Sequence, residues 1–286
     1  MAKIRDLLAD RPTYSFEFFP PKTDEAKVRL EKTIQELEPL APTFASVTYG
    51  AGGSTRSSTR DVVIGIETDT SMTSMAHLTC VGHSRAEIVD ILNGYEDAGV
   101  ENVLALAGDP QRGGPVGEFT FATELVGLIR QTGSFSIGVA AHPEGHPRSV
   151  DLRSDRRRLA EKLEMADFAI TQFFFRASSY HHMMGELAGL GCEKPVLPGI
   201  MPVTSLSQVE RFAQLSGAEF PVEVAARLEA ADGPDEVRKI GIDIATTMCQ
   251  ELLDAGAPGL HFYTLNQSTA TREIYRNLGL APETAG

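Results

Sequence analysis

The alternation of strand-like and helix-like segments along the whole chain is the feature that most constrains the fold. Eight short apolar runs have the pattern of strands buried on both faces, and each precedes a helical pattern. Such alternation predicts βαβ units and a parallel sheet. The predicted strands are residues 13–18, 44–49, 74–79, 102–107, 136–141, 168–172, 196–200 and 259–264.

Clear helical patterns cover residues 24–37, 85–98, 206–215 and 237–255, with apolar positions recurring at three and four residues. Glycines close several of them, at Gly99, Gly217 and Gly256. No glycine-rich dinucleotide fingerprint opens the first helix, so eight units predict a closed (βα)8 TIM barrel. An open, doubly wound sheet is the alternative.

Length and composition suit one such barrel. The chain has 286 residues and is 42% hydrophobic, which predicts a single domain over residues 1–286. No apolar run approaches the ~20 residues that span a bilayer, and no secretory h-region follows the first residues, so we expect a cytoplasmic protein that does not bind membranes. Cysteines at positions 80, 192 and 249 are too few and too widely spaced for a disulfide framework or a zinc knuckle.

The net charge of −13 argues against nucleic acid as a partner, because acidic surfaces repel phosphates. A polyanionic ligand would have to meet local positive charge. The expected partners are therefore small molecules, and the sequence leaves the oligomeric state open.

In a (βα)8 barrel, chemistry takes place at the carboxyl ends of the strands. Polar residues stand at seven of these predicted ends, which suggests one shared site. They are Glu17, Thr48, His77, Asp109, His142, Gln172 and Asn266.

Glu17 is the leading candidate for a general acid. Three phenylalanines, at positions 16, 18 and 19, flank it at the predicted end of the first strand. Partial desolvation there would help the carboxyl hold a proton near neutral pH. The alternative is an ion pair with Lys22 at the rim.

Other polar residues leave a structural and a functional interpretation open. Asp109 before a proline is typical of an Asx-turn but also follows a strand end, and His77 is either a core histidine or a donor to a ligand. Gln172 stands beside an aromatic run that forms core or the wall of a flat-ring pocket. Asp155 and Lys162 belong to a charged helix, whose default interpretation is a solvated face.

His142 and His146 have the i, i+4 spacing of some zinc helices. Prolines at 143 and 147 oppose a continuous helix, and no third ligand accompanies the pair. No metal site is therefore predicted.

Seven sequence strings, in order from residue 15 to residue 266, resemble bacterial methylenetetrahydrofolate reductases with a single catalytic domain. The strings are Ser-Phe-Glu-Phe-Phe-Pro-Pro-Lys, Ser-Val-Thr-Tyr-Gly-Ala, His-Leu-Thr-Cys, Gly-Asp-Pro, Ile-Thr-Gln-Phe-Phe-Phe, Pro-Gly-Ile-Met-Pro-Val and His-Phe-Tyr-Thr-Leu-Asn. The resemblance implies reduction of 5,10-methylenetetrahydrofolate to 5-methyltetrahydrofolate with NADH or NADPH, in one-carbon metabolism and methionine supply. In that family, FAD usually carries the hydride.

The resemblance also implies residue roles. Glu17 would be the general acid that helps open the five-membered ring to an iminium ion, Asp109 would stabilise positive charge beside the pterin, and Gln172 would bind the pterin and the nicotinamide. Gln208, Phe212 and Gln267 match folate-contacting positions. The positions where the family holds FAD are Thr48, His77, Ala107, Gly108, Asp109, Ala122, His142, His146, Asp155 and Lys162.

This chain departs from the family pattern at three of these positions. Ala107 and Gln267 each replace an arginine, and His142 replaces a tyrosine. Losing one charge-assisted contact costs about 1.5–3 kcal/mol, so the sequence predicts weak or absent flavin binding. The residues for folate chemistry are retained.

Two other classes of function remain as alternatives. A metal-dependent barrel hydrolase would need His-x-His on an early strand, where this chain offers Glu17 alone. A non-catalytic folate-binding module would leave that carboxyl without a role.

Overall fold

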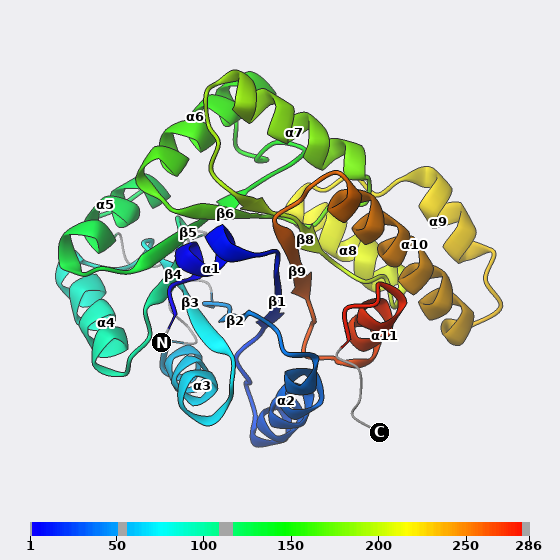
Figure 1. The fold of residues 1–286 in the computed structure, drawn as a ribbon, viewed down its shortest axis with the longest axis horizontal. Coiled ribbons are helices and arrows are strands. Elements are labelled where there is room, and N and C mark those ends of the chain that lie inside the picture. Colours follow the sequence, from blue (N-terminus) through cyan, green and yellow to red (C-terminus); the bar gives the residue numbers. More distant parts are fainter. Residues whose placement is uncertain (1, 51–55, 109–116, 282–286) are drawn as a thin grey trace.

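The structure is a computed structural model that describes residues 2–50, 56–108 and 117–281. All its strands lie in one parallel sheet (Figure 1). They are β1 (Thr13–Phe18), β2 (Phe44–Val47), β3 (Thr73–Thr79), β4 (Asn102–Leu106), β5 (Ser136–Ala141), β6 (Phe168–Thr171), β7 (Val196–Leu197), β8 (Gly199–Ile200) and β9 (Gly259–Tyr263).

Helices surround this sheet (Figure 1). They are α1 (Ile4–Asp10), α2 (Asp24–Leu37), α3 (Arg56–Asp69), α4 (Arg85–Asp97), α5 (Ala122–Thr132), α6 (Leu152–Met165), α7 (Ala177–Gly189), α8 (Leu206–Ser216), α9 (Val222–Glu229), α10 (Pro234–Asp254) and α11 (Thr269–Asn277), with a short 3₁₀ turn at Glu38–Leu40.

The sheet closes through a strand that is interrupted once. Its order is β7-β6-β5-β4-β3-β2-β1-β9-β8, and only Pro198 separates β7 from β8. Proline has no N–H for the ladder, so one strand position appears as two short strands, β7 paired with β6 and β8 paired with β9. The predicted (βα)8 barrel is confirmed, and the doubly wound alternative is wrong.

Two layers of apolar side chains hold the barrel together. The larger one fills the space between the strands and the helices, while a smaller one inside the barrel includes Phe44, Met75 and Phe168, all fully buried. Parallel strands covered on both faces need apolar residues on both. The strand sequences are continuous apolar runs because both faces of each strand are buried.

Helix α1 packs under the interior cluster, at the end of the barrel where the strands begin. Ile4 is fully buried in that cluster, and its backbone N–H donates to the side chain of Asn102 at 2.8 Å. This helix was not predicted, because seven residues carry too little periodicity to identify a helix.

The predicted boundaries agree with the observed ones within a few residues. β1, β5 and α2 match at both ends, and the largest difference is the start of α10, at Pro234 rather than 237. Gly99, Gly217 and Gly256 have φ values of +81°, +76° and +86°, the left-handed conformation expected after a helix end. Helix α9 was not predicted.

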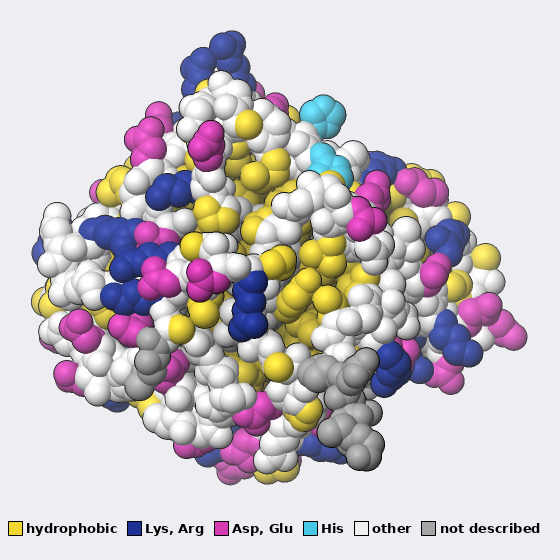
Figure 2. Space-filling view, viewed as in Figure 1, with side chains coloured by type: hydrophobic (Ala, Val, Ile, Leu, Met, Phe, Trp, Pro, Cys, Tyr) yellow, Lys and Arg dark blue, Asp and Glu magenta, His cyan; other side chains and the backbone are white. Residues whose placement is uncertain are grey.

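Acidic and basic side chains are interspersed on the face seen in Figure 2, and hydrophobic side chains gather toward its middle. Within the described ranges, no helix combines the length and apolarity that crossing a bilayer requires.

We expect Gly259→Ala to destabilise the barrel at the junction of β9 and β1. Gly259 has φ +139°, and an added Cβ would lie 1.8 Å from the carbonyl oxygen of Thr13. Backbone strain and this clash predict a loss of at least about 2 kcal/mol in unfolding free energy. Chemical denaturation measures it.

The matched control is Gly185→Ala in α7, where an added Cβ meets nothing within 4 Å. Helix propensity predicts a gain of about 0.5–1 kcal/mol there. Equal effects of the two substitutions would contradict the structural role of Gly259.

Candidate active site

Glu17 lies at the carboxyl end of β1, where the chain is fastened to the end of β9. Its backbone oxygen accepts a hydrogen bond from Thr264 Oγ1 at 2.6 Å. The side-chain amide of Asn266 accepts from the backbone N–H of Phe19 at 2.8 Å and donates to its oxygen at 2.9 Å. Leu265 and Asn266 both have positive φ, 52° and 55°, which is strained for residues with a Cβ. Asn266, itself in a strained conformation, therefore holds the position of the loop after Glu17.

The Glu17 side chain points into the barrel between two imidazoles. Successive strand residues alternate between faces, so Thr13, Ser15 and Glu17 share the interior face of β1. Glu17 is only 6% exposed, and its Oε2 lies 3.4 Å from His77 Nε2 and 3.6 Å from His261 Nε2. The alternative pairing with Lys22 does not occur among the contacts that the structure gives Glu17.

Burial keeps two of the groups beside this carboxyl, His77 and Tyr263, uncharged. It lowers the pKa of His77 to about 4, although the nearby Glu17 opposes the shift, so this ring is neutral at pH 7. Burial, reinforced by Glu17, raises the pKa of Tyr263 well above its usual value, and the Tyr263 hydroxyl donates to the backbone oxygen of Thr171 at 2.7 Å. Two hydrogen-bonding groups beside the carboxyl are therefore neutral at pH 7.

The predicted folate-contacting residues lie around the ends of β6, β8 and β9. Gln172 follows β6, and its side-chain oxygen accepts from the backbone N–H of Phe173, whose ring meets the edge of Tyr263 at 6.0 Å. Phe212, on α8, is half-buried against the apolar cluster that contains Phe173. Gln208 is half-buried on the same helix, whereas Gln267 is exposed after β9.

The positions matched to flavin contacts form a second group, centred on the start of α6. The Asp155 carboxylate accepts from Ser149 Oγ at 2.9 Å and from the backbone N–H of His146 at 3.1 Å, and it pairs with Arg156 at 2.9 Å. Arg156, 2% exposed, also bonds to the Glu186 carboxylate and to the backbone oxygens of His142 and Pro143. Asp155 is thus engaged inside the protein rather than on the solvated face expected by default.

Lys162 and His142 complete this second group. Lys162 Nζ donates to the backbone oxygen of Ala140 at 2.6 Å, and burial lowers its pKa to about 8. The His142 ring meets the His146 ring edge-on at 4.6 Å, and burial, followed by the nearby His146, lowers the pKa of His142 to about 4. Within the described ranges, no group of three His, Cys, Asp or Glu side chains could hold a metal ion.

The remaining predicted positions lie on the neighbouring strand ends and loops. Thr48 follows β2 and its backbone N–H donates to the oxygen of Phe18, which places it beside the catalytic candidate's strand. Ala107 and Gly108 follow β4, and Ala122 begins α5. Gly108 has φ +84°, and an added Cβ would lie 2.9 Å from Thr79 Cβ. Asp109 lies outside the described residues.

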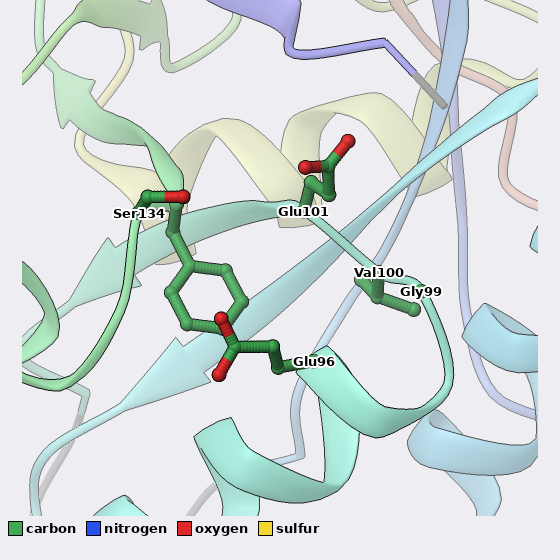
Figure 3. A pocket seen from close by; sticks show the side chains of 6 residues that line it. Glu96, Gly99, Val100, Glu101 and Ser134 are labelled. Atoms are coloured by element: carbon green, nitrogen blue, oxygen red, sulfur yellow. The ribbon is translucent and has the colours of Figure 1, made fainter.

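Two cavities lie away from these strand ends. One of about 300 Å³ is shown in Figure 3, with Glu96, Glu101 and Ser134 at its wall. These residues precede β4 and β5, so this cavity is at the end of the barrel opposite Glu17. The second, of about 570 Å³, lies between α2 and α3 on the outside of the barrel. Neither coincides with the predicted site.

Sequence reasoning missed several residues that the fold brings to the site. Ser15, His261 and Tyr263 line the interior beside Glu17, and Arg156 organises the second group. A signal for Ser15 was present, because polar residues at 13, 15 and 17 alternate along one strand. For His261 the signal was its position two residues before Tyr263 on the last strand, on the same face.

The fold and the buried carboxyl at the carboxyl ends of its strands define an α/β barrel with an enzyme-like site. A family model for methylenetetrahydrofolate reductase matches residues 3–279. The 5,10-methylenetetrahydrofolate reductases of Salmonella typhimurium and Escherichia coli are 37% and 36% identical to this chain over 270 residues, which covers 94% of this chain and 91% of each relative. The chain belongs to the methylenetetrahydrofolate reductase family.

More distant comparisons agree. The Arabidopsis thaliana protein named methylenetetrahydrofolate reductase (NADH) 1 is 35% identical over 300 residues, which covers 98% of this chain and 51% of that protein. A Clostridium thermocellum protein that binds two copies of 5-methyl-5,6,7,8-tetrahydrofolic acid has a TM-score of 0.67 at 14% identity, with 97% of each chain covered. The latter likeness concerns the fold alone.

We expect the buried, neutral His142 to make stability depend on pH. Below pH 6.5 the unfolded chain takes up a proton that the native ring accepts only near pH 4, so stability falls as the pH falls through this window. When the pH is lowered from 7 to 5, the unfolding free energy of wild type should fall by about 2 kcal/mol more than that of His142→Tyr. Denaturation at both pH values measures the difference.

The control is His182→Tyr, because His182 is exposed on α7. Its pH dependence should match wild type within about 0.5 kcal/mol. If His142→Tyr behaves like this control, the native His142 ring is accessible to protons.

Proposed function

We propose that the protein reduces 5,10-methylenetetrahydrofolate to 5-methyltetrahydrofolate, with hydride from NADH or NADPH. Family membership supports this reaction, since the relatives at 36–37% identity carry the name of that reductase over nearly the same length. The single observation that carries the proposal is the Glu17 carboxyl, buried between His77 and His261 at the end of β1.

Glu17 supplies the proton that the reaction needs before hydride arrives. It protonates the nitrogen that leaves the bridging carbon, the five-membered ring opens, and that carbon becomes an iminium ion. A buried carboxyl beside the neutral His77 and Tyr263 can deliver a proton there, whereas water is largely excluded. Hydride then adds to the electron-poor carbon.

The residues around β6 and α8 bind and orient the substrate in this proposal. Gln172 offers an amide that donates and accepts toward the pterin and the nicotinamide, and Phe212 offers an apolar face. Gln208 and Gln267 contact the remainder of the folate. By resemblance, the Asp109 carboxylate offsets the positive charge of the iminium ion. Such a fixed charge stabilises the transition state electrostatically.

The second group of residues does not fit a firmly held FAD. Of the described positions that match flavin contacts, Lys162 is the one lysine or arginine. Burial lowers its pKa to about 8, and its Nζ already donates to the backbone oxygen of Ala140. Asp155 is engaged by Arg156, Ser149 and His146, and His142 is neutral. A flavin diphosphate needs charge-assisted donors, and Ala107 removes one.

We therefore propose that hydride passes from the nicotinamide directly to the iminium carbon. The nicotinamide would stack on the pterin, with Gln172 reaching both rings. The alternative, a non-catalytic folate-binding module, would bind the substrate but never oxidise NADH. A kinetic assay therefore distinguishes the two functions.

We expect Glu17→Gln to keep the fold and folate binding but to lose most turnover. An amide cannot donate the proton at this place, and general acid catalysis contributes about 10²–10⁴-fold. Folate-dependent oxidation of NADH or NADPH, followed in the steady state, measures kcat and KM separately.

The matched control is Glu101→Gln, the same change at the opposite end of the barrel beside the cavity of Figure 3. It should keep wild-type turnover. A Glu17→Gln enzyme as fast as this control would remove Glu17 from the acid step.

We expect the freshly purified protein to be colourless in the visible range, and its turnover to be independent of added FAD. Installing the family's residues, Ala107→Arg with His142→Tyr, should tighten FAD binding about 10–100-fold, as regained charge-assisted contacts predict. Visible spectra and the quenching of flavin fluorescence measure both.

A yellow protein with stoichiometric flavin, or turnover that requires FAD, would contradict the direct route. In that case the folate reaction and the role of Glu17 would stand, and only the hydride carrier would change.

A further inference from the structure

A groove between α2 and α3 lies open on the outside of the barrel, away from the candidate active site. It has a volume of about 570 Å³. Its floor is apolar, because Leu30 and Ile66 are buried there and Ile34 and Val62 are half-buried. Apolar side chains at the bottom of an exposed groove are a common feature of surfaces that bind another helix.

Hydrogen bonds fix the width of this groove at both ends. At one end, Ser58 Oγ donates to the backbone oxygen of Pro21 at 3.0 Å, and at the other the Glu38 carboxylate accepts from the backbone N–H of Ser71 at 2.8 Å. Between them, Gly65 stands in the interior of α3, where an added Cβ would meet no atom outside the helix backbone closer than 3.9 Å. Glycine is unfavourable inside a helix, but here it leaves room for a second backbone to approach.

The rim of the groove is acidic over most of its length. Glu31 and Glu38 lie along the α2 side, and Asp61 and Asp69 lie along α3. Among the described residues that line the groove, Lys27 is the one lysine or arginine, and it belongs to the first half of α2. The groove is therefore negative toward the C-terminal ends of both helices, and its positive charge lies toward their N-terminal ends.

Helix α6 has a complementary order of charges on its exposed face. Arg153, Arg157, Glu161 and Glu164 are exposed and recur at intervals of four, four and three residues, so they share one face. The basic half of this face comes first and the acidic half second. The ion pairs that the structure describes on α6 are made by the buried Arg156 rather than by these two arginines. Both exposed arginines are therefore available to carboxylates of another molecule.

The three helices also match in length. Each of α2, α3 and α6 contains 14 residues. With α6 laid antiparallel in the groove and the ends aligned, Arg157 would come beside Glu31, and Arg153 beside Asp69. Glu161 would come beside the one cation of the groove. The N-terminal end of α6, which carries partial positive charge, would lie at the C-terminal ends of the other two helices, whereas a parallel arrangement would bring like charges together.

Helix α6 cannot reach the groove of its own chain, since it lies on the opposite side of the barrel (Figure 1). We propose that the groove between α2 and α3 binds α6 of a second copy of this chain, with the helix directions opposed. Leu152 and Met165, at the two ends of α6, are 44% and 42% exposed and give the contact an apolar component beside its ion pairs. This inference is independent of the proposed function.

The geometry of the contact predicts how the protein assembles. Groove and helix are different surfaces on opposite sides of the molecule, so each added copy still presents one of them, and association does not stop at two copies. The average mass in sedimentation velocity should rise with protein concentration beyond twice the mass of one chain. It should fall at high ionic strength, because salt screens exposed charges. A monomer under all these conditions, or a dimer that does not grow, would overturn the proposal.

Charge reversals test which surfaces meet. Glu31→Arg and Arg157→Glu should each weaken association about 3–10-fold, as expected for exposed ion pairs. Mixing the two variants should restore association, because the reversed groove of one then meets the reversed helix of the other. Both side chains are exposed, so the fold should be retained, which circular dichroism checks. The matched control is Glu251→Arg, the same change on the exposed face of α10, which should associate like wild type.

Two results would assign the groove to another occupant and overturn the proposal. One is weaker association in Glu31→Arg with no change in Arg157→Glu, since the groove would then bind a different part of the second copy. The other is a monomer that binds spermidine in calorimetry as wild type but not as Glu31→Arg, since the acidic rim would then serve a small organic cation. Self-association that neither reversal changes would overturn it as well.

Discussion

Pairing of the first strand with the last one is the constraint on which the site depends. β1 pairs with β9 from Thr13 opposite Gly259 to Glu17 opposite Tyr263. A shift of one residue in this register would turn Glu17 out of the barrel, because side chains alternate between faces. The close approach at Gly259, the Thr264 bond to the Glu17 backbone and the Asn266 clamp on Phe19 all act on this one junction. Barrel closure and placement of the carboxyl are therefore the same structural event.

Much of the fold followed from local pattern, because the helical periodicity and the apolar strand runs lie within short stretches of sequence. The catalytic candidate could also be found, since Glu17 stands among phenylalanines at a strand end. The partner that faces it could not. His261 is 244 residues further along the chain than Glu17 and 246 further than Ser15. Only the closed register brings these residues together. Helix α1 and the break at Pro198 were missed for a different reason, because tertiary packing decides them rather than periodicity.

The second group shows how a charged sequence can mislead. The run around residues 153–158 has the composition of a solvated helix face, yet Asp155 and Arg156 are 8% and 2% exposed. Burying such charges is costly unless each is paired and hydrogen-bonded, and here Arg156 is satisfied by Glu186, Asp155 and two backbone oxygens. Groups already satisfied within the protein have little to offer a ligand phosphate. At the positions matched to flavin contacts by resemblance, the alanine at position 107 and the internal bonds of Asp155 and Lys162 all reduce what the protein could offer a flavin phosphate.

The charges of neighbouring groups decide whether a buried carboxyl such as Glu17 can hold a proton. A cation beside Glu17 would hold it as a carboxylate, and a second carboxylate would compete for the proton. Burial removes two such charges, because it keeps His77 neutral and leaves Tyr263 protonated. Neutral N–H groups stabilise a carboxylate by less than an ion pair would. In the proposed reaction, the new positive charge would appear on the substrate as the carboxylate appears on Glu17, and each charge would lower the energy of the other in a site that excludes water. The neutral His77 and Tyr263 beside one buried carboxyl would therefore suit the proposed delivery of a proton and then a hydride to the same folate.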